Sequence, residues 1–232
     1  VCSNTDTFFK DIKSFPKGEI WSFDKDLNIL KKRKYWTLDF KPNTKINLQD
    51  AVDKVEELLI NSIKLRLRSD VNIGISLSGG IDSGLIGTII SKKFNLSLDT
   101  FSIVDEDERY NEEKNINSII QNNNFGTNYK VKLETKNFVN GLKDLITYHS
   151  APVITITSYI NSLIAKEFKK TSNKVALSGI AGDELFLGYY SHYLYWLLEN
   201  QKDKNFKKLK SDWFQITGSH VENPLIKDLD NF

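Results

Sequence analysis

Hydrophobic residues follow a helical period early in the chain and then switch between strand and helix patterns. From Asn47 to Leu67, leucine, valine and isoleucine recur at steps of three and four, which predicts a helix with Asn47 as its N-cap ahead of Asp50. Beyond it, short apolar runs predict strands, and longer stretches with helical spacing predict helices. The expected strands cover 73–77, 99–104, 129–133 and 174–177, and the expected helices run from the first strand to about 95, around 116–120, and over 138–148, 158–171 and 193–197.

Strands that alternate with helices at this distance predict an α/β fold, with a parallel twisted sheet flanked by helices. Ligands of such sheets bind beyond the carboxyl ends of the strands. We therefore expect the binding site of this chain at the loops that follow its strands.

Two short aromatic runs precede the helices, on either side of Pro16-Lys17-Gly18. Proline and glycine are typical of turns and aromatic residues favour strands, so the segment from Thr7 to Trp36 predicts a short β-hairpin. We interpret residues 1–46 as the end of a preceding β-rich domain with its connector, and residues 47–232 as a second domain.

A glycine-rich loop follows the first predicted strand of the sheet. Residues 73–83 read I-G-I-S-L-S-G-G-I-D-S, and a helical pattern begins after them. The glycines allow close approach of the backbone, and loop amides together with a helix N-terminus favour phosphate or pyrophosphate. Asp82 beside phosphates implies a bridging hard cation, most simply Mg²⁺. The Walker and dinucleotide patterns are both absent, and the structural alternative is an ordinary Gly-Gly turn capped by Asp82 or Ser83.

A second glycine-rich string follows the last predicted strand. Residues 177–189 read L-S-G-I-A-G-D-E-L-F-L-G-Y, so again a strand ends in Ser-Gly and an aspartate follows. Two such loops in one parallel sheet would bring Asp82 and Asp183 to one Mg²⁺ from opposite sides. The pair of loops is a more specific signal than either loop alone.

The composition is that of an ordinary globular protein, with 232 residues, of which 40% are hydrophobic and 27% charged. The net charge of +2 argues against a nucleic-acid partner, and no apolar run approaches the about 20 residues of a membrane span. The single cysteine, Cys2, excludes an internal disulfide and a multi-cysteine metal site and fits a cytoplasmic setting. Because the chain begins with Val1 and contains no methionine, we expect a processed chain or a piece of a longer one.

The string S-G-G-I-D-S at Ser78 to Ser83 resembles the pyrophosphate loop of the ATP-pyrophosphatase superfamily, whose members adenylate a carboxylate, amide or carbonyl group and release pyrophosphate. With the second string, it resembles more narrowly the synthetase domain of glutamine-dependent asparagine synthetases and their relatives, the β-lactam synthetases and lasso-peptide cyclases. The resemblance runs from about Phe8 to Tyr189 and includes S-D-V-N-I-G and T-F-S-I. It implies that residues 1–46 are the end of a glutaminase domain and a linker.

This resemblance also implies roles for single residues. Asp82 and Asp183 would bind Mg²⁺, and Ser178 and Gly179 would lie against the ribose and α-phosphate. Independently of the resemblance, the acidic run 105–108 is either a solvated loop or a mobile loop near the nucleotide. The residues implied to hold the pyrophosphate of ATP are Ser78, Gly79, Gly80, Asp82 and Ser83, and those whose main chain would face adenine are Ser76 and Ile103.

The chain departs from the family pattern in the second loop. Asparagine-forming members usually carry glutamate where this chain has Ile180, and glycine where it has Ala181. Isoleucine cannot act as a general base. Adenylation could be retained, while the amine step would use another group such as Glu184, or an acceptor other than ammonia. Glu184 could equally be a structural partner at the start of the following helix.

Two further departures lie elsewhere in the chain. The family usually has a histidine near Tyr129, and its loss has no interpretation here. The family's lysine-bearing C-terminal part and its Arg-Val-Pro-Phe-Leu-Asp-like segment have no match in residues 190–232, where one helix and then polar chain are expected. Cys2 lies next to the predicted hairpin and not at the start of a glutaminase, so it is not expected to be the glutaminase nucleophile.

The leading hypothesis is an ATP- and Mg²⁺-dependent, AMP-forming amide ligase that joins a small carboxylate to an amine or to glutamine-derived ammonia. A glutaminase domain in the full-length chain and a homodimer are expected partners, and neither nucleic acid nor a membrane is. The alternatives are a related cyclase or sugar-acid amidotransferase with a different amine, and a degenerate nucleotide-binding module without catalysis.

Overall fold

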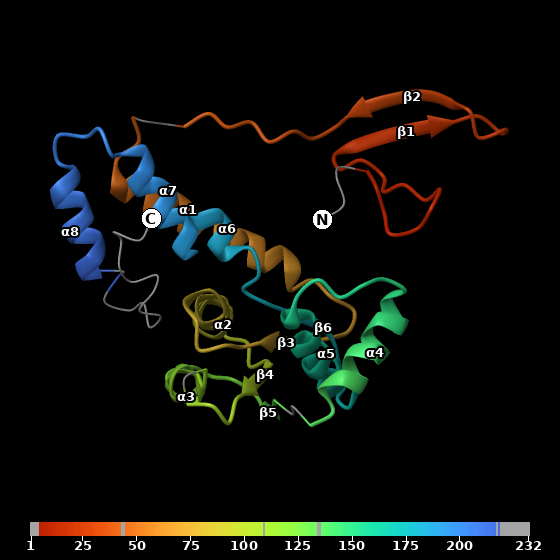
Figure 1. Ribbon diagram of the computed structural model, residues 1–232. Coiled ribbons are helices and arrows are strands. Elements are labelled where there is room, and N and C mark those ends of the chain that lie inside the picture. The colour runs from red at the N-terminus through yellow and green to blue at the C-terminus, as the bar shows by residue number, and fades with distance from the viewer. Residues whose placement is uncertain (1–4, 43–44, 109, 134–135, 217, 219–232) are drawn as a thin grey trace. The chain divides into compact units, whose positions relative to one another are not determined.

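The computed structural model describes residues 5–42, 45–108, 110–133, 136–216 and 218 (Figure 1). The chain forms two compact units. The first comprises Val1–Arg68 and Glu134–Leu163, and the second comprises Ser69–Leu133 and Ile164–Phe232. Each unit is built from chain segments that are distant in sequence. Cys2 lies outside the described residues.

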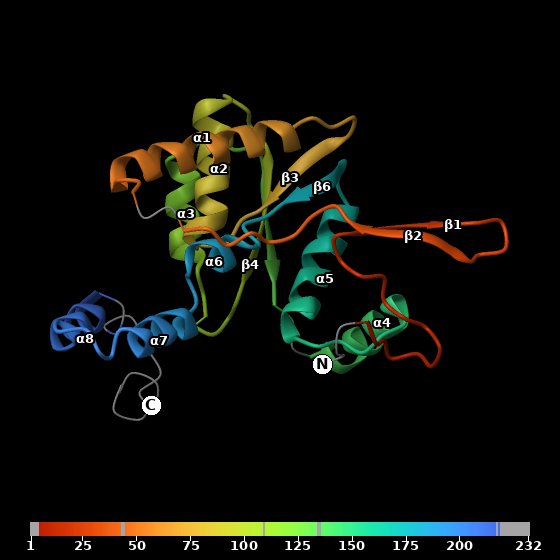
Figure 2. The same cartoon turned by 90° about the horizontal axis from the view of Figure 1, so that it is seen from above.

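The first unit contains the N-terminal hairpin. Strands β1 (Glu19–Phe23) and β2 (Ile29–Lys34) pair antiparallel (Figure 2). The connecting turn is held by Asp24, whose Oδ1 accepts hydrogen bonds from the backbone N–H of Asp26 at 2.9 Å and of Asn28 at 2.8 Å. This network of local hydrogen bonds fixes the turn.

The predicted hairpin is therefore confirmed, but its expected turn at Pro16–Gly18 is wrong. The aromatic run 8–15 forms no strand. Gly18, with φ of 70°, instead marks the entry into β1, and its carbonyl accepts a hydrogen bond from Tyr35 N–H at 2.9 Å. The physical reason is that Asp24 and Asn28 supply more side-chain hydrogen bonds to a turn than Pro16 and Gly18 can.

Helices α1 (Leu48–Arg66) and α4 (Phe138–His149) also belong to the first unit, together with the beginning of α5 (Ile156–Lys169). Asn47 caps α1 as predicted, because its side chain accepts a hydrogen bond from Asp50 N–H at 2.9 Å. Tyr159 of α5 is buried and packs edge-on against Phe138, with ring centroids 5.0 Å apart. Aromatic packing thus joins α4 to α5.

The second unit is built on a four-stranded parallel sheet. Its strands are β3 (Asn72–Ser76), β4 (Asp99–Val104), β5 (Asn128–Lys132) and β6 (Asn173–Leu177), in the spatial order β5-β4-β3-β6. The predicted α/β class and the parallel sheet are confirmed. Because the chain passes from β3 outward to β5 and then returns to the other side of β3, the order of strands reverses at β3.

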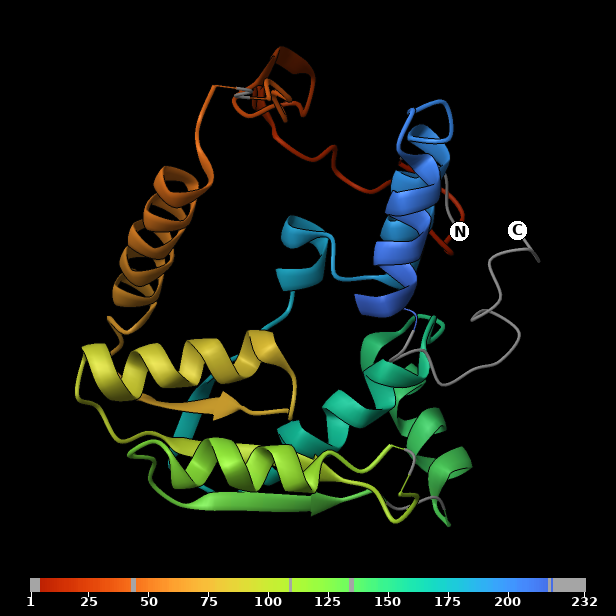
Figure 3. The ribbon, with the colours of Figure 1, turned by 90° about the vertical axis from the view of Figure 1, so that its left-hand side faces the viewer.

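Helices cover both faces of this sheet. On one face, α2 (Ile81–Lys93) and α3 (Glu113–Gln121) lie side by side (Figures 2 and 3). On the other face, Phe168 of α5 stacks on Phe101 of β4 with ring centroids 3.7 Å apart. Phe101 and Ile75 are fully buried, so the core lies on both sides of β3 and β4.

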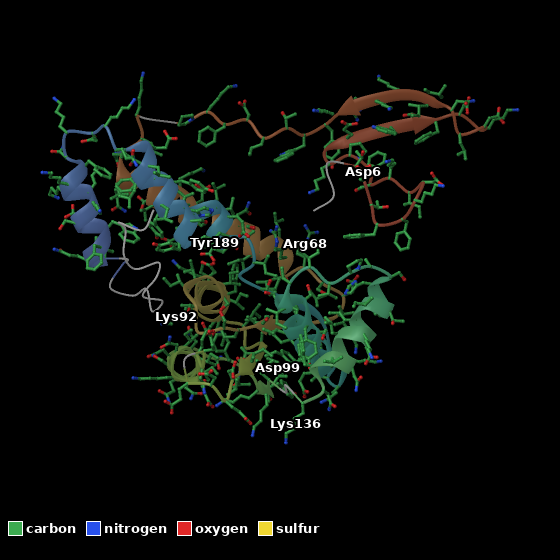
Figure 4. The ribbon with its side chains drawn as sticks, viewed as in Figure 1. Asp6, Arg68, Lys92, Asp99, Lys136 and Tyr189 are labelled. Atoms are coloured by element: carbon green, nitrogen blue, oxygen red, sulfur yellow. The ribbon has the colours of Figure 1, made fainter. Side chains whose placement is uncertain are left out.

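A half-buried polar anchor joins the strands at the beginning of β4. Asp99, labelled in Figure 4, accepts hydrogen bonds from Thr127 N–H and from the side-chain amide of Asn173, both at 2.9 Å. These bonds connect β4 to β5 and β6, and both donors, a backbone N–H and a side-chain amide, are uncharged. The opposite, carboxyl ends of the strands are left for the loops.

Three helices follow the last strand: α6 (Gly182–Phe186), α7 (Tyr190–Glu199) and α8 (Phe206–Ile216). The helix α7 was predicted from the sequence, but the residues beyond it were interpreted as polar chain without a helix, so α8 was missed. Trp213 of α8 is buried, and its ring lies 5.8 Å from that of Tyr190. Across the part of the chain that the structure describes, no helix is both long and apolar enough to cross a membrane.

Candidate active site

The first glycine-rich loop lies at the carboxyl end of β3, where the order of strands reverses. β3 ends at Ser76, the loop turns through Ser78–Gly80, and α2 begins at Ile81 (Figure 3). β6 runs parallel to β3, so the second loop starts from the same edge of the sheet. The topology therefore brings the two sequence motifs together, as predicted.

Side chains of the first loop hold its own backbone. The Ser83 hydroxyl accepts a hydrogen bond from Ser78 N–H at 3.0 Å and lies 2.8 Å from the Ser78 hydroxyl. Ser78 Oγ also accepts from Gly80 N–H at 3.2 Å. Gly80, the N-cap of α2, supplies no side chain to cap the helix. The first N–H groups of α2 therefore lack a side-chain cap and can donate to an anion.

The remaining glycine of the loop contacts a residue far away in sequence. Gly79 N–H donates a hydrogen bond to a carboxylate oxygen of Glu112 at 3.0 Å. A Cβ added to Gly79 would lie 2.8 Å from the Cβ atoms of both Glu112 and Asn115. The loop thus rests directly on the first turn of α3, a contact that needs glycine at position 79.

The second loop packs against the start of α2. A Cβ on Gly179 would lie 2.7 Å from both the Cβ of Asp82 and the N of Ser83. Gly182 approaches even more closely, because its Cβ would overlap the carboxylate of Asp82. Gly188 stands in the same relation to the carboxylate of Asp183. Each aspartate of the site therefore lies against a glycine of the second loop.

The electrostatics of the site agree with this close approach. Burial raises the pKa of the Asp82 carboxyl, and the negative charges of Asp183 and Glu184 raise this pKa further. Like charges that share a site disfavour ionisation of one another. A cation between them would relieve the repulsion. Within the described residues, no group of three or more His, Cys, Asp or Glu side chains is arranged to hold a metal ion, so a bound cation would need ligands from a substrate or from water.

Glu184 is exposed and pairs with the tyrosine that ends the motif. Its Oε1 accepts a hydrogen bond from the Tyr189 hydroxyl at 2.8 Å, which lowers the pKa of Glu184 and raises that of Tyr189. The ring of His192 lies 5.1 Å from that of Tyr189, and its charge also lowers the pKa of Glu184. Tyr189 is labelled in Figure 4. Glu184 therefore remains ionised at neutral pH.

Two of the departures from the family pattern, Ile180 and Ala181, lie side by side in the second loop. Ile180 is 78% exposed and offers no polar group. Ala181 has φ of 78° and ψ of 3°, in the left-handed region that favours glycine. The glycine expected at position 181 would adopt this conformation without strain.

Ser76 and Ile103 lie on neighbouring strands near the carboxyl edge. Ser76 stands opposite Phe101, and the carbonyl of Phe101 accepts a hydrogen bond from Leu77 N–H at 2.8 Å. Backbone groups alternate sides along a strand, so Ile103 directs its N–H and C=O to the same side as Phe101. The pairing of β3 with β4 ends at Ser76 and Phe101, so Ile103 has no residue of β3 opposite it.

Sequence reasoning missed two residues of this region. Glu112 lies in the polar segment just before α3, where no role was predicted for it, and its contact with Gly79 spans 33 residues. Tyr189 was recognised as part of the motif but given no role. Spacing shows neither contact, because the bond between Gly79 and Glu112 depends on where segments that follow different strands meet, and the bond between Tyr189 and Glu184 depends on how the second loop folds.

The family model for asparagine synthase matches residues 54–228. The chain belongs to the asparagine synthase family. Asparagine synthetase [glutamine-hydrolyzing] 1 of Bacillus subtilis is 32% identical over 155 residues, which are 67% of this chain and 24% of that protein. A putative asparagine synthetase [glutamine-hydrolyzing] 2 of Methanocaldococcus jannaschii is 29% identical over 210 residues, 89% of this chain and 38% of that protein.

This member of the asparagine synthase family thus spans 24% and 38% of the length of these two relatives. Among solved structures, an NH3-dependent NAD synthetase from Campylobacter jejuni has a TM-score of 0.37 at 17% identity, covering 78% of this chain and 90% of that one. At this TM-score, the likeness supports no conclusion about the chain.

Proposed function

We propose that this chain carries the synthetase part of an ATP-dependent, AMP-forming amide ligase of the asparagine synthase family. The observation that carries the proposal is the meeting of two strand-end loops, which sets Asp82 against Gly182 and couples its charge to that of Asp183. A glutaminase domain in the full-length protein, a domain boundary near residue 46 and a homodimer belong to the same proposal.

Each loop would bind a different part of ATP. The uncapped N–H groups at the start of α2, with the hydroxyls of Ser78 and Ser83, would hold the pyrophosphate. Ser178 and Gly179 would lie against the ribose and α-phosphate. Adenine would bind the main chain at Ser76 and Ile103, where β4 extends past the end of β3.

The donor set fits Mg²⁺. This ion prefers oxygen ligands and is commonly held by one or two carboxylates together with substrate phosphates and water. Asp82 and Asp183 would supply those two carboxylates. Burial, and after it the negative charges of Asp183 and Glu184, raise the pKa of Asp82, and a cation would offset those charges. When bound, Mg²⁺ would neutralise charge that develops on the pyrophosphate leaving group.

The chemistry follows from this arrangement. A substrate carboxylate oxygen would attack the α-phosphorus of ATP, a new P–O bond would form, and the bond to pyrophosphate would break. Amides at the start of α2 would stabilise the charge on the departing pyrophosphate. An amine would then attack the acyl carbon, release AMP and lose a proton, for which Glu184 is the proposed acceptor.

ATP–pyrophosphate exchange tests the first half of this reaction. The full-length protein with Mg²⁺, ATP and labelled pyrophosphate should form labelled ATP only when its carboxylate is present, and EDTA should abolish the exchange. A panel of carboxylates that begins with aspartate identifies the substrate. Absence of both exchange and MgATP binding in calorimetry would overturn the proposal.

A second candidate is a ligase whose amine is not ammonia, and the exposed, apolar side chain of Ile180 favours it. The discriminating experiment supplies different amines after adenylation and identifies the amide by mass spectrometry. Formation of asparagine from aspartate and glutamine would reject this candidate. A degenerate nucleotide-binding module would be recognised by MgATP binding without any pyrophosphate exchange.

A further inference from the structure

The side chain of Glu112 points away from the helix that it precedes. Glu112 is the residue directly before α3, and its side chain makes no hydrogen bond to the first turn of that helix. The side chain of Asn111 accepts from Glu113 N–H at 2.8 Å instead, which leaves the Glu112 carboxylate to accept from Gly79 N–H at 3.0 Å.

This bond is part of a tight junction. The backbone of Glu112 is fixed in the helix, since its carbonyl accepts a hydrogen bond from Ile116 N–H at 3.0 Å. Gly79 packs between Glu112 and Asn115 so closely that a Cβ would meet both side chains at 2.8 Å and the Glu112 carbonyl oxygen at 3.1 Å. A rigid helix therefore holds the glycine-rich loop at one defined place.

The loop amides divide into two groups as a result. The N–H groups of Ser78, Gly79 and Gly80 donate to acceptors within the protein, which are the side chains of Ser83, Glu112 and Ser78. The N–H groups in the first turn of α2 have no side-chain acceptor at the N-cap. The hydrogen bonds of the loop N–H groups therefore orient the start of α2. Of the two groups, only the N–H groups in the first turn of α2 remain available to bind a phosphate.

We propose that Glu112 is a positioning residue for the pyrophosphate loop, which it fixes on α3 through Gly79 N–H so that the start of α2 can bind the phosphates of ATP. This inference rests on the proposed function. It assigns Glu112 no contact with ATP and no proton transfer. It predicts that the affinity for MgATP depends on a hydrogen-bond acceptor at position 112 and does not depend on the negative charge of that side chain.

The test compares three variants of the full-length protein. Glu112→Ala removes the acceptor, whereas Glu112→Gln keeps an acceptor oxygen of the same reach without the charge. Glu113→Ala is the matched control, because Glu113 is the next residue and its Oε1 pairs with Lys130 at 2.6 Å. Isothermal titration with MgATP gives the affinity, pyrophosphate exchange gives KM and kcat, and thermal melting monitors folding.

For Glu112→Ala, we expect about tenfold weaker MgATP binding and a matching rise in the KM for ATP, as for the loss of one well-placed hydrogen bond, with kcat within about threefold of wild type. Glu112→Gln should restore both values to within about threefold, and Glu113→Ala should leave them unchanged. A purely structural role would lower the melting temperature and leave the affinity of the folded protein unaltered.

Three results would overturn the inference. Wild-type affinity in Glu112→Ala would show that the bond does not position the loop. Tighter MgATP binding in Glu112→Ala would show that the carboxylate competes with phosphate. Equal losses in Glu112→Ala and Glu112→Gln would show that charge matters and the acceptor does not. If the wild-type protein itself binds no MgATP, the proposed function fails, and the inference with it.

Discussion

Gly182 lies directly against the carboxylate of Asp82. A Cβ on Gly182 would stand 2.7 Å from Oδ1 of Asp82 and would overlap its other oxygen and its Cγ. The second loop can approach the first only because residue 182 carries no side chain. The distance between the two loops, and with it the proposed Mg²⁺ site, depends on this contact.

Gly182→Ala should therefore disable nucleotide binding while the sheet still folds. The new methyl group must displace the Asp82 carboxylate, so we expect at least about tenfold weaker MgATP binding by calorimetry, which corresponds to about 1.4 kcal/mol. Gly84→Ala within α2 is the control, because its Cβ would meet only the side-chain end of Ile119, at 3.0 and 3.7 Å, and it should stay within about threefold of wild type. Equal affinities for the two variants would contradict the steric explanation.

Much of the fold was predictable because its signals are local. The apolar periods gave the four strands and the helix cap at Asn47, and the two Ser-Gly strings marked the strand ends that meet at one edge. The turn at Asp24 was missed because Pro16 and Gly18 are the stronger turn signals on composition alone. Helix α8 was missed because its single buried aromatic, Trp213, does not stand out among charged neighbours.

The contacts within the candidate site were less predictable, for a physical reason. The bond from Gly79 to Glu112 and the approach of Gly182 to Asp82 depend on the relative position of loops from different strands. Sequence spacing carries no information on such distances. Ala181 was only partly predictable. The sequence shows that alanine stands where the family has glycine, but only the structure shows the positive φ that makes alanine unfavourable there.

Asp82→Asn and Asp183→Asn should each remove the Mg²⁺ dependence of nucleotide binding. The amide keeps the shape of the side chain but supplies a much weaker ligand for a hard cation. We expect at least about tenfold weaker MgATP binding for each, and little difference between titrations with and without Mg²⁺. Asp53→Asn on α1, where Asp53 accepts a hydrogen bond from Gln49 at 2.7 Å, is the control and should bind as wild type. Retained Mg²⁺ dependence in both site variants would exclude these two ligands.

Without Mg²⁺, the raised pKa of Asp82 should make the protein less stable as the pH rises. Its pKa in the folded state lies above the ordinary 3.8, chiefly through burial and then through the charges of Asp183 and Glu184. The folded state therefore binds the proton more tightly than the unfolded state. The associated stability is present below pH 3.8 and is lost as the pH rises through the pKa of the folded state.

Thermal melting in EDTA tests whether stability falls as the pH rises. Asp82→Asn is uncharged at every pH, so it should melt at a higher temperature than wild type at pH 7, and the difference should shrink as the pH falls toward 3.8. The same substitution would thus stabilise the fold and disable the site. A difference in melting temperature that is constant with pH would exclude the charge of Asp82 as its cause.

Ala181→Gly should stabilise the second loop. Ala181 has φ of 78°, and a left-handed conformation costs a residue with a Cβ about 1–2 kcal/mol. Part of this gain is offset by the greater freedom of glycine in the unfolded chain, so we expect a net gain of about 1 kcal/mol or less and a rise of about 2–4 °C in Tm at most. Ala165→Gly in the exposed part of α5 is the matched control and should lower Tm, because glycine disfavours a helix interior. Changes of the same sign would contradict the strain at Ala181.

Glu184→Gln should separate the two halves of the proposed reaction. Glutamine can still accept the hydrogen bond that Tyr189 donates to Glu184 at 2.8 Å, so the loop should keep its shape. It cannot accept a proton from the attacking amine. We expect pyrophosphate exchange within about threefold of wild type and at least about tenfold slower amide formation, as for the loss of a general base.

Tyr189→Phe is the companion variant, because it removes the hydrogen bond and leaves the carboxylate. The pKa of Glu184, which this bond lowers, should then rise toward its ordinary 4.5, and amide formation should persist. Single-turnover assays with preformed acyl-adenylate measure the amine step directly. If Glu184→Gln forms amide at the wild-type rate and Tyr189→Phe does not, then Glu184 acts only as a partner that orients Tyr189, and the proton acceptor of the amine step must be another group.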